Sequence, residues 1–152
     1  MRIFISYSSP DINIISILAE QLRVYGDVYY WSKNYLPGEP AWEEIYNWID
    51  NSDVVLSLIT DNTVARANSV SREVERAKAQ NKFIIPIVSG AVPKSDLGII
   101  SDLPYQEINS NNLAPGISRI IGLIYNNKKD ERRITGLILV VIAFLLWLQN
   151  RN

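Results

Sequence analysis

The sequence contains neither cysteine nor histidine among its 152 residues. Without cysteine no disulfide can form, so nothing in the chain points to an oxidising compartment. A cysteine nucleophile, a Ser-His-Asp triad and a zinc site built from Cys or His are all excluded, and no metal site is predicted. Any acid–base chemistry must therefore rest on carboxylates, lysine or tyrosine.

The net charge of the chain is only −1, but the charged residues are unevenly distributed. Residues 1–127 carry ten basic and fourteen acidic side chains, a net charge of −4, whereas residues 128–152 carry five basic and two acidic ones. An acidic body lacks the basic face that nucleic-acid binding requires, so no nucleic-acid partner is expected. The length suits one globular domain.

A long hydrophobic run, Ile134–Leu148 (ITGLILVVIAFLLWL), has no charge and only Thr135 as a polar side chain. A helix that is apolar on every side lies either in a deep core or in lipid. At 1.5 Å per residue the run measures about 22 Å, which is short for a hydrocarbon core of roughly 30 Å. We expect a transmembrane helix at 134–149 after a charged linker at 128–133. The alternative is a helix buried in a soluble oligomer.

The orientation of this helix follows from the basic residues near its ends. Four Lys or Arg residues precede the hydrophobic run and one follows it, so the body of the chain should be cytoplasmic. Residues 2–7 already have the pattern of a strand, so no N-terminal signal peptide is expected. We therefore expect a single-pass protein with a C-terminal anchor.

Short β-branched runs alternate with amphipathic patterns along the body, which predicts a doubly wound α/β fold with a parallel sheet. Ser9 is a suitable N-cap, Pro10 a suitable first helical residue, and Gly26 a suitable helix end. In such sheets ligands bind beyond the carboxyl ends of the strands. The predicted strands are 2–7, 27–31, 53–60, 82–88 and 105–108, and the predicted helices are 10–25, 42–51, 64–80 and 113–125.

Five sequence segments follow one another in a characteristic order and spacing. They are Phe4–Asp11 (FISYSSPD), Leu36–Gly38 (LPG), Trp42–Ile45 (WEEI), Val70–Glu73 (VSRE) and Phe83–Ile87 (FIIPI). Together they resemble the Toll/interleukin-1 receptor (TIR) domain family over about residues 1–127. The resemblance implies a flavodoxin-like sheet of five parallel strands.

Many TIR domains cleave the nicotinamide–ribose bond of NAD, and others only assemble signalling complexes. The essential glutamate of the cleaving members falls on Glu73. Ser69 replaces an aromatic residue of the same family segment, and Trp31 replaces an acidic residue that often follows the second strand. The resemblance implies that NAD is contacted by Phe4, Ser8, Ser9, Trp31, Tyr35, Gly38 and Ser69. Among these, Ser8 and Ser9 are candidates for phosphate contact at the start of the first helix, or for simple capping.

The chemistry suits a chain without histidine. In NAD the nicotinamide ring carries a positive charge and leaves as a neutral molecule. It therefore needs no general acid, unlike the leaving oxygen of a glycoside. Positive charge then gathers on the ribose, where one well-placed carboxylate can stabilise it. NAD would be the substrate, and no further cofactor is expected.

Glu73 also has an ordinary interpretation as a surface residue paired with Arg76. Helical spacing places Glu73 at the border of an apolar stripe formed by Val70, Val74 and Ala77, whereas Glu75 should face solvent. A border position also suits a residue that faces a cleft.

The sequence thus predicts a membrane-anchored TIR enzyme that cleaves NAD, with a linear or cyclic ADP-ribose product, in antiphage or stress defence. Homo-oligomers formed through TIR–TIR contacts are expected. Two alternatives stay open: a non-catalytic adaptor that assembles signalling complexes at the membrane, and an effector that acts through its hydrophobic tail.

Overall fold

The structure, a computed structural model, describes residues 1–31, 40–64, 67–109, 112 and 114–127, and it leaves undescribed the side chains of residues 40, 41, 64 and 67–69. The chain divides into two compact units, residues 1–119 and 120–152. The account below concerns the first unit, together with the helical stretch at 114–127 that begins in it.

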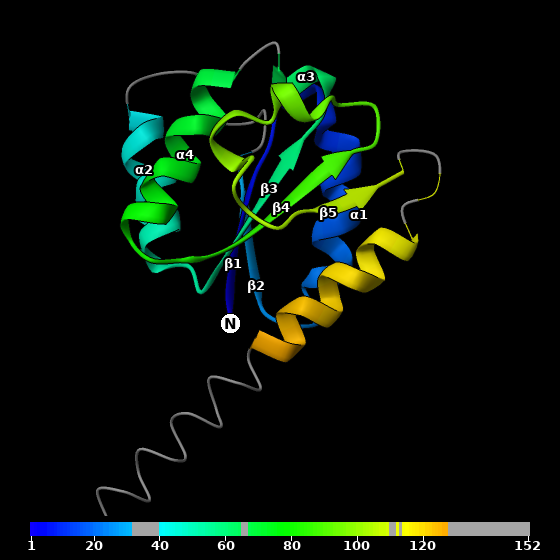
Figure 1. Cartoon of the computed structure of the whole chain (residues 1–152). Coiled ribbons are helices and arrows are strands. Elements are labelled where there is room, and N and C mark those ends of the chain that lie inside the picture. The colour runs from blue at the N-terminus through cyan, green and yellow to red at the C-terminus, as the bar shows by residue number, and fades with distance from the viewer. Residues whose placement is uncertain (32–39, 65–66, 110–111, 113, 128–152) are drawn as a thin grey trace, which may run out of the picture. The chain divides into compact units, whose positions relative to one another are not determined.

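Five parallel strands form one sheet in the order β2-β1-β3-β4-β5 (Figure 1). This is the flavodoxin-like order of doubly wound folds, and it confirms the predicted fold class. The chain winds outward from β1 in one direction and from β3 in the other, so the switch point lies between these two strands. The strands are β1 (Arg2–Ser6), β2 (Asp27–Tyr30), β3 (Val54–Ile59), β4 (Phe83–Ser89) and β5 (Gln106–Ile108).

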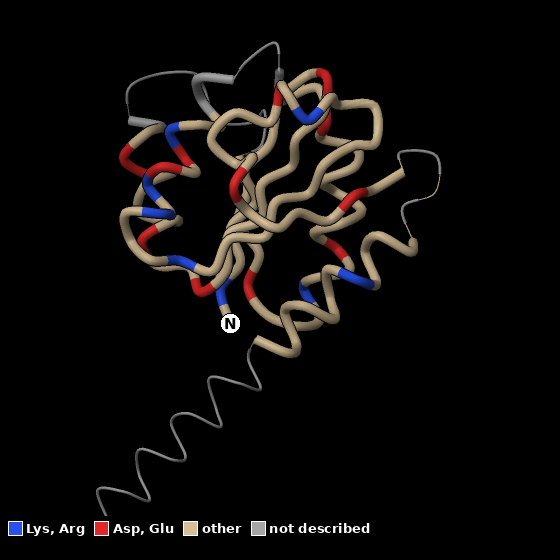
Figure 2. The backbone as a smooth tube through the Cα atoms, viewed as in Figure 1, with Lys and Arg blue, Asp and Glu red and all other residues tan. Residues whose placement is uncertain are grey.

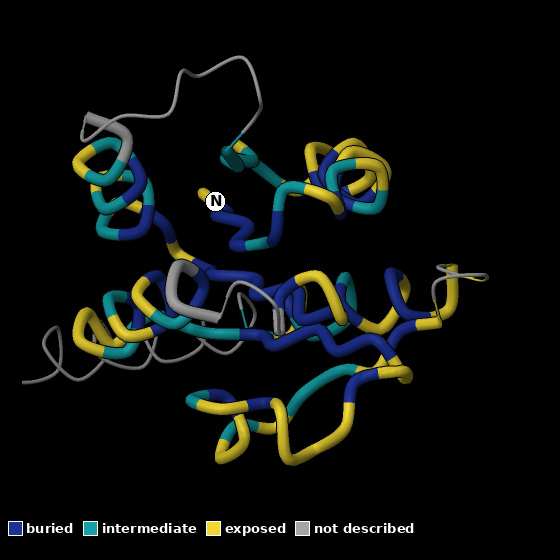
Figure 3. Tube along the Cα trace, turned by 90° about the horizontal axis from the view of Figure 1, so that it is seen from above, coloured by how far each residue is buried: buried dark blue, intermediate teal, exposed yellow. Residues whose placement is uncertain are grey.

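Strands β3 and β4 are built from uncharged, mostly β-branched residues, as strands covered on both faces require. All six residues of β3 are buried. Figure 2 shows that charged residues gather on the helices and loops and are absent from these two strands. Figure 3 shows the same division as burial, with dark central strands and exposed outer loops.

Helices cover both faces of the sheet (Figure 1). Helices α2 (Pro40–Asn51) and α4 (Ala67–Ala79) lie on one face, and α1 (Ile12–Leu22) lies on the other. The alternation of side chains along a strand sends every second residue to the same face. Phe4 of β1 therefore packs towards α2 and α4, in a cluster with Ile45, Ile49, Val55 and Ala77.

The remaining elements are short. A 3-10 turn, η1 (Ser9–Asp11), precedes α1, and a single-turn helix, α3 (Asp61–Val64), precedes α4. Two further 3-10 turns, η2 (Lys94–Asp96) and η3 (Gly98–Ile100), lie between β4 and β5.

Two predicted helix boundaries were wrong for local reasons. The helix predicted at 10–25 begins as the 3-10 turn η1, whose N-cap is Ser8 and not Ser9, without a capping side-chain bond. Pro10 fits the first turn of either helix type, so the sequence could not separate them. The helix predicted at 64–80 is α4, with α3 before it.

Within the part of the chain that the structure describes, no helix is long and apolar enough to cross a bilayer. The predicted membrane segment at 134–149 and the linker at 128–133 lie outside the described residues.

Gly26 lies where the entry to β2 passes the first residue of the chain. A Cβ at this position would stand 1.9 Å from the Met1 carbonyl oxygen, the same oxygen that accepts a 2.9 Å hydrogen bond from the Asp27 amide. Gly26→Ala should therefore push β1 and β2 apart at their starts and lower the free energy of unfolding by about 1–3 kcal/mol, measured by urea unfolding.

Gly122→Ala is the matched control, because nothing lies within 4 Å of a Cβ at that helical position. It should raise stability by up to about 1 kcal/mol, the helix preference of alanine over glycine. Equal unfolding midpoints for Gly26→Ala and the parent would contradict the close approach.

Candidate functional site

Glu73 is a buried carboxylate on α4, with only 8% of its surface exposed. Burial raises the pKa of this carboxyl from 4.5 to about 7. In the described residues its Oε2 atom has no hydrogen-bond partner. A buried carboxylate without a full set of donors is costly, and such groups cluster at functional sites.

The interpretation of Glu73 as a surface residue paired with Arg76 is wrong. Arg76 forms its ion pair with Asp50 of α2, to which Nε donates at 2.8 Å. No ion pair to Glu73 occurs among the described side chains. Glu75 is exposed, as the helical spacing predicted.

Two buried serines lie on the face of the sheet that α4 covers. Ser6 is the last residue of β1, and Ser57 is its register partner on β3. Ser57 alternates with Val55 and Ile59, both of which pack against α4 residues. Like Glu73 Oε2, the Oγ atoms of both serines are buried and lack a hydrogen-bond partner in the described part of the chain.

Ser6 acts on Glu73 electrostatically. Its hydroxyl opposes the rise in the pKa of Glu73, because a hydroxyl dipole stabilises the ionised carboxylate. Its Oγ nevertheless makes no hydrogen bond of standard geometry with any described group. Three unpaired polar atoms in so small a region are unusual for a folded protein.

Tyr7 links this region to the end of β2. Its hydroxyl donates a hydrogen bond to the carbonyl oxygen of Trp31, and its ring meets that of Tyr30 edge-on, with centroids 6.2 Å apart. Burial, followed by the nearby Tyr30 and Glu73, raises the pKa of Tyr7 to about 12. Tyr7 is therefore neutral, and its hydroxyl proton is engaged by the Trp31 carbonyl. The sequence singled out the loop after Tyr7 but not this side chain.

Phe4 and Trp31 both pack against Trp48. Trp31 is half-buried, its carbonyl is held by Tyr7, and its ring lies 6.3 Å from that of Trp48. Phe4 is only 1% exposed and packs in the core against Trp48. The Phe4 ring is enclosed by α2, α4 and β3, and its predicted contact with NAD, like that of Trp31, stays a prediction.

The start of the first helix holds Asp11 at the N-cap of α1, buried and without a side-chain capping bond. The predicted contact of Ser8 and Ser9 with a phosphate stays a prediction. The Ser8 side chain is buried and donates at 3.2 Å to the carbonyl oxygen of Asn62. Ser9 is half-buried and makes no capping bond.

Three predicted site residues cannot be placed. Tyr35 and Gly38 lie outside the described residues, as does the side chain of Ser69, whose backbone belongs to α4. Their predicted contacts with NAD stay predictions.

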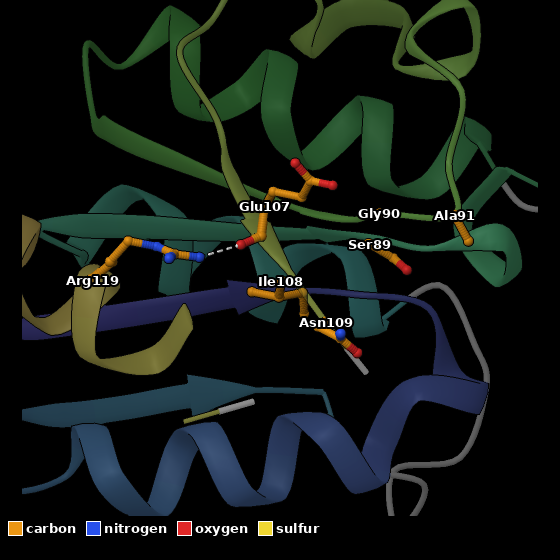
Figure 4. A pocket seen from close by; sticks show the side chains of 7 residues that line it. All are labelled: Ser89, Gly90, Ala91, Glu107, Ile108, Asn109 and Arg119. Atoms are coloured by element: carbon orange, nitrogen blue, oxygen red, sulfur yellow. Dashed lines mark hydrogen bonds between the residues drawn. The ribbon is translucent and has the colours of Figure 1, made fainter. Parts of the chain in front are cut away.

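A separate cavity of about 480 Å³ opens at the carboxyl ends of β4 and β5, where the sequence predicted nothing. Its walls include Ser89, Glu107, Asn109 and Arg119 (Figure 4). Arg119 donates at 2.8 Å to the carbonyl oxygen of Glu107, while the Glu107 carboxylate points away from the guanidinium. Both charged side chains are exposed, whereas Glu73 is buried.

Comparisons with known proteins agree with this architecture. A family model described as TIR domain matches residues 3–121. The TIR domains of the activated Roq1 resistosome, which recognises the pathogen effector XopQ, superpose with a TM-score of 0.65 at 12% identity, covering 81% of this chain and 98% of that one. The Clostridium botulinum CMP N-glycosidase BcmB gives a TM-score of 0.52 at 12% identity, covering 79% and 98%. No curated protein matches the chain.

The raised pKa of Glu73 makes stability depend on pH. Because the folded pKa of about 7 exceeds the ordinary 4.5, the folded state holds a proton that the unfolded state has lost between these values. Stability therefore falls as pH rises from about 4.5 through 7. Relative to the parent, Glu73→Gln should gain about 2–3 kcal/mol in the free energy of unfolding between pH 4.5 and pH 8.

Urea unfolding of both proteins at pH 4.5, 6 and 8 measures this change. Glu75→Gln, the exposed neighbour on the same helix, should show a constant difference from the parent. A constant difference for Glu73→Gln as well would mean that Glu73 titrates normally.

Proposed function

Because the chain belongs to the TIR domain family, we propose that it is an enzyme that cleaves the bond between nicotinamide and ribose in NAD. The observation that carries the proposal is Glu73: a buried carboxylate with an unpartnered oxygen, near the end of β1 at the switch point of the sheet. Ligands of open α/β sheets bind at such switch points.

Glu73 would act by electrostatic stabilisation. As the C–N bond breaks, its electron pair leaves with nicotinamide, and positive charge develops on the ribose. An ionised carboxylate in a poorly solvated site stabilises that charge more strongly than it would in water. Water, or a group of the same molecule, then attacks the ribose and yields a linear or cyclic ADP-ribose product.

The reaction needs Glu73 in its ionised form. With a pKa of about 7, about half of the free protein would hold the carboxylate protonated at neutral pH. A cationic nicotinamide riboside placed against it would favour ionisation, since an opposite charge lowers a carboxyl pKa. The electrostatic contact is thus strongest when positive charge is present, as transition-state stabilisation demands.

The solved structures support the class of reaction through their fold and through the activity of one of them. One of the two is a CMP N-glycosidase, an enzyme that acts on a bond between a base and a ribose. The other is an assembled resistosome that contains TIR domains. We propose that copies of this chain also associate through TIR–TIR contacts, so that activity rises with protein density.

The proposal is tested by incubating the purified full chain with NAD, dilute and at high density on liposomes, and measuring free nicotinamide. Glu73→Gln keeps the size of the side chain but not its charge, and should lower turnover by about two to three orders of magnitude. For the parent, kcat/KM should rise with pH through about 7, the pKa of Glu73.

Glu75→Gln is the control, because it makes the same chemical change two residues away on the exposed side of α4. It should retain the activity of the parent. Undiminished release of nicotinamide by Glu73→Gln would refute the assignment. A parent that cleaves CMP but not NAD would refute the substrate, and a parent that releases no base would favour the adaptor function.

We also propose that residues 134–149 anchor the protein in a membrane, with a role in antiphage or stress defence. The full chain should then sediment with membranes and resist carbonate extraction, whereas a chain that ends at Asn127 should stay in the supernatant. Full-length protein in the soluble fraction without detergent would contradict the anchor.

A further inference from the structure

A second carboxylate lies buried at the switch point of the sheet, and the proposed chemistry does not use it. Asp11 is 5% exposed. Its Oδ2 accepts a hydrogen bond from Thr60 Oγ1 at 2.7 Å, and its Oδ1 accepts one from Asn62 Nδ2 at 2.7 Å. Both donors are neutral, and no ion pair involves Asp11 among the described residues.

These bonds belong to a tie between two loops, the one after β1 and the one after β3. Ser8 Oγ adds a third bond, to the carbonyl oxygen of Asn62. On the β3 side, Thr63 Oγ1 accepts from the Thr60 amide at 3.2 Å and donates to the Leu58 carbonyl at 3.1 Å. Thr60 and Thr63 are themselves buried, whereas Asn62 is exposed, so only the Thr60 side of the tie is screened from water.

Stability alone gives little reason for a carboxylate here. A buried charge loses its hydration, and a well-packed apolar side chain of similar size often serves the fold as well or better. A carboxylate differs because its two oxygens accept hydrogen bonds along defined directions. With one donor from each of two residues, Asp11 fixes the distance and orientation between the two loops.

The position of the tie in the chain connects it to Glu73. Ser6 ends β1 just before the Asp11 loop, on the face of the sheet that α4 covers, where its hydroxyl also lowers the pKa of Glu73. The loop after β3 continues into α3 and then α4, the helix that carries Glu73. The end of β1 and the segment that leads to Glu73 are thus both connected to the two hydrogen-bonded loops.

We propose that Asp11 is a positioning residue for the reaction of Glu73: by joining the loops after β1 and β3, it fixes the end of β1, which carries Ser6, relative to α4, which carries Glu73. This inference rests on the proposed NAD cleavage for its kinetic consequence. Asp11 itself touches no substrate. Its effect is on the geometry around the carboxylate, so it acts on turnover more than on binding.

The test exchanges the donor and the acceptor. Asp11→Asn keeps the shape of the side chain but turns one of its two acceptors into a donor, so the Thr60 hydroxyl or the Asn62 amide must reorient, and kcat should fall about tenfold or more while KM changes little. The double variant Asp11→Asn with Asn62→Asp restores one donor–acceptor pair and the original net charge. It should recover kcat to within about threefold of the parent, as a double-mutant cycle for directly interacting groups requires.

Asp50→Asn is the matched control. It makes the same change at a carboxylate that is held by Arg76 between α2 and α4, and it should leave kcat unchanged. Asp11→Asn behaving like Asp50→Asn would overturn the proposal, as would a folded double variant that remains as slow as Asp11→Asn.

A second measurement does not depend on catalysis. Thr60→Val removes one donor to Asp11 without altering charge, and it remains informative if Asp11→Asn does not fold. Loosening the tie should let water reach Glu73, so the pH-dependent stability gained by Glu73→Gln should fall to less than half in the Thr60→Val background. An undiminished gain would overturn the positioning role. A parent without activity would refute only the proposed function, because this stability measurement would still decide the role of Asp11.

Discussion

Two carboxylates lie buried at the junction of β1 and β3, and neither has a cationic partner in the described part of the chain. Removing a carboxylate from water is costly unless hydrogen bonds replace its hydration. Asp11 receives a donor at each oxygen, so the cost is largely offset and the surrounding loops are fixed. Glu73 keeps an oxygen without a donor, and its pKa rises to about 7. Asp11 therefore fixes the geometry of the loops, whereas the ionisation of Glu73 stays sensitive to a nearby positive charge.

The strand order explains why both groups meet here. In the order β2-β1-β3-β4-β5, the connections after β1 and β3 leave towards opposite faces of the sheet. The apolar packing that fills the rest of the sheet is interrupted at this divergence, and polar side chains occupy the place. Ser6 and Ser57 mark the same position on the two strands themselves, since they are register partners in otherwise apolar segments.

Much of this could be predicted from the sequence, because it depends on short-range patterns. Alternating runs fixed the parallel sheet, and helical spacing put Glu73 at the edge of an apolar stripe. The partners of Asp11 could not be predicted, since they lie 49 and 51 residues away and no local pattern links them. Phe4 lies on the same face as Ser6 but two residues earlier in β1, where α2 and α4 enclose it, and strand alternation alone does not show this difference.

The absence of histidine gives the burial of Glu73 its significance. A chain that lacks the side chain which ordinarily titrates near neutral pH can obtain such a group only by shifting another. Here desolvation is the largest cause of the shift. The ionised form of Glu73 is consequently poorly stabilised by the protein itself, and it gains most from a positive charge brought by a ligand. In the proposed reaction this positive charge is greatest as the ribose loses nicotinamide. The transition state would therefore supply the positive charge that stabilises the ionised Glu73.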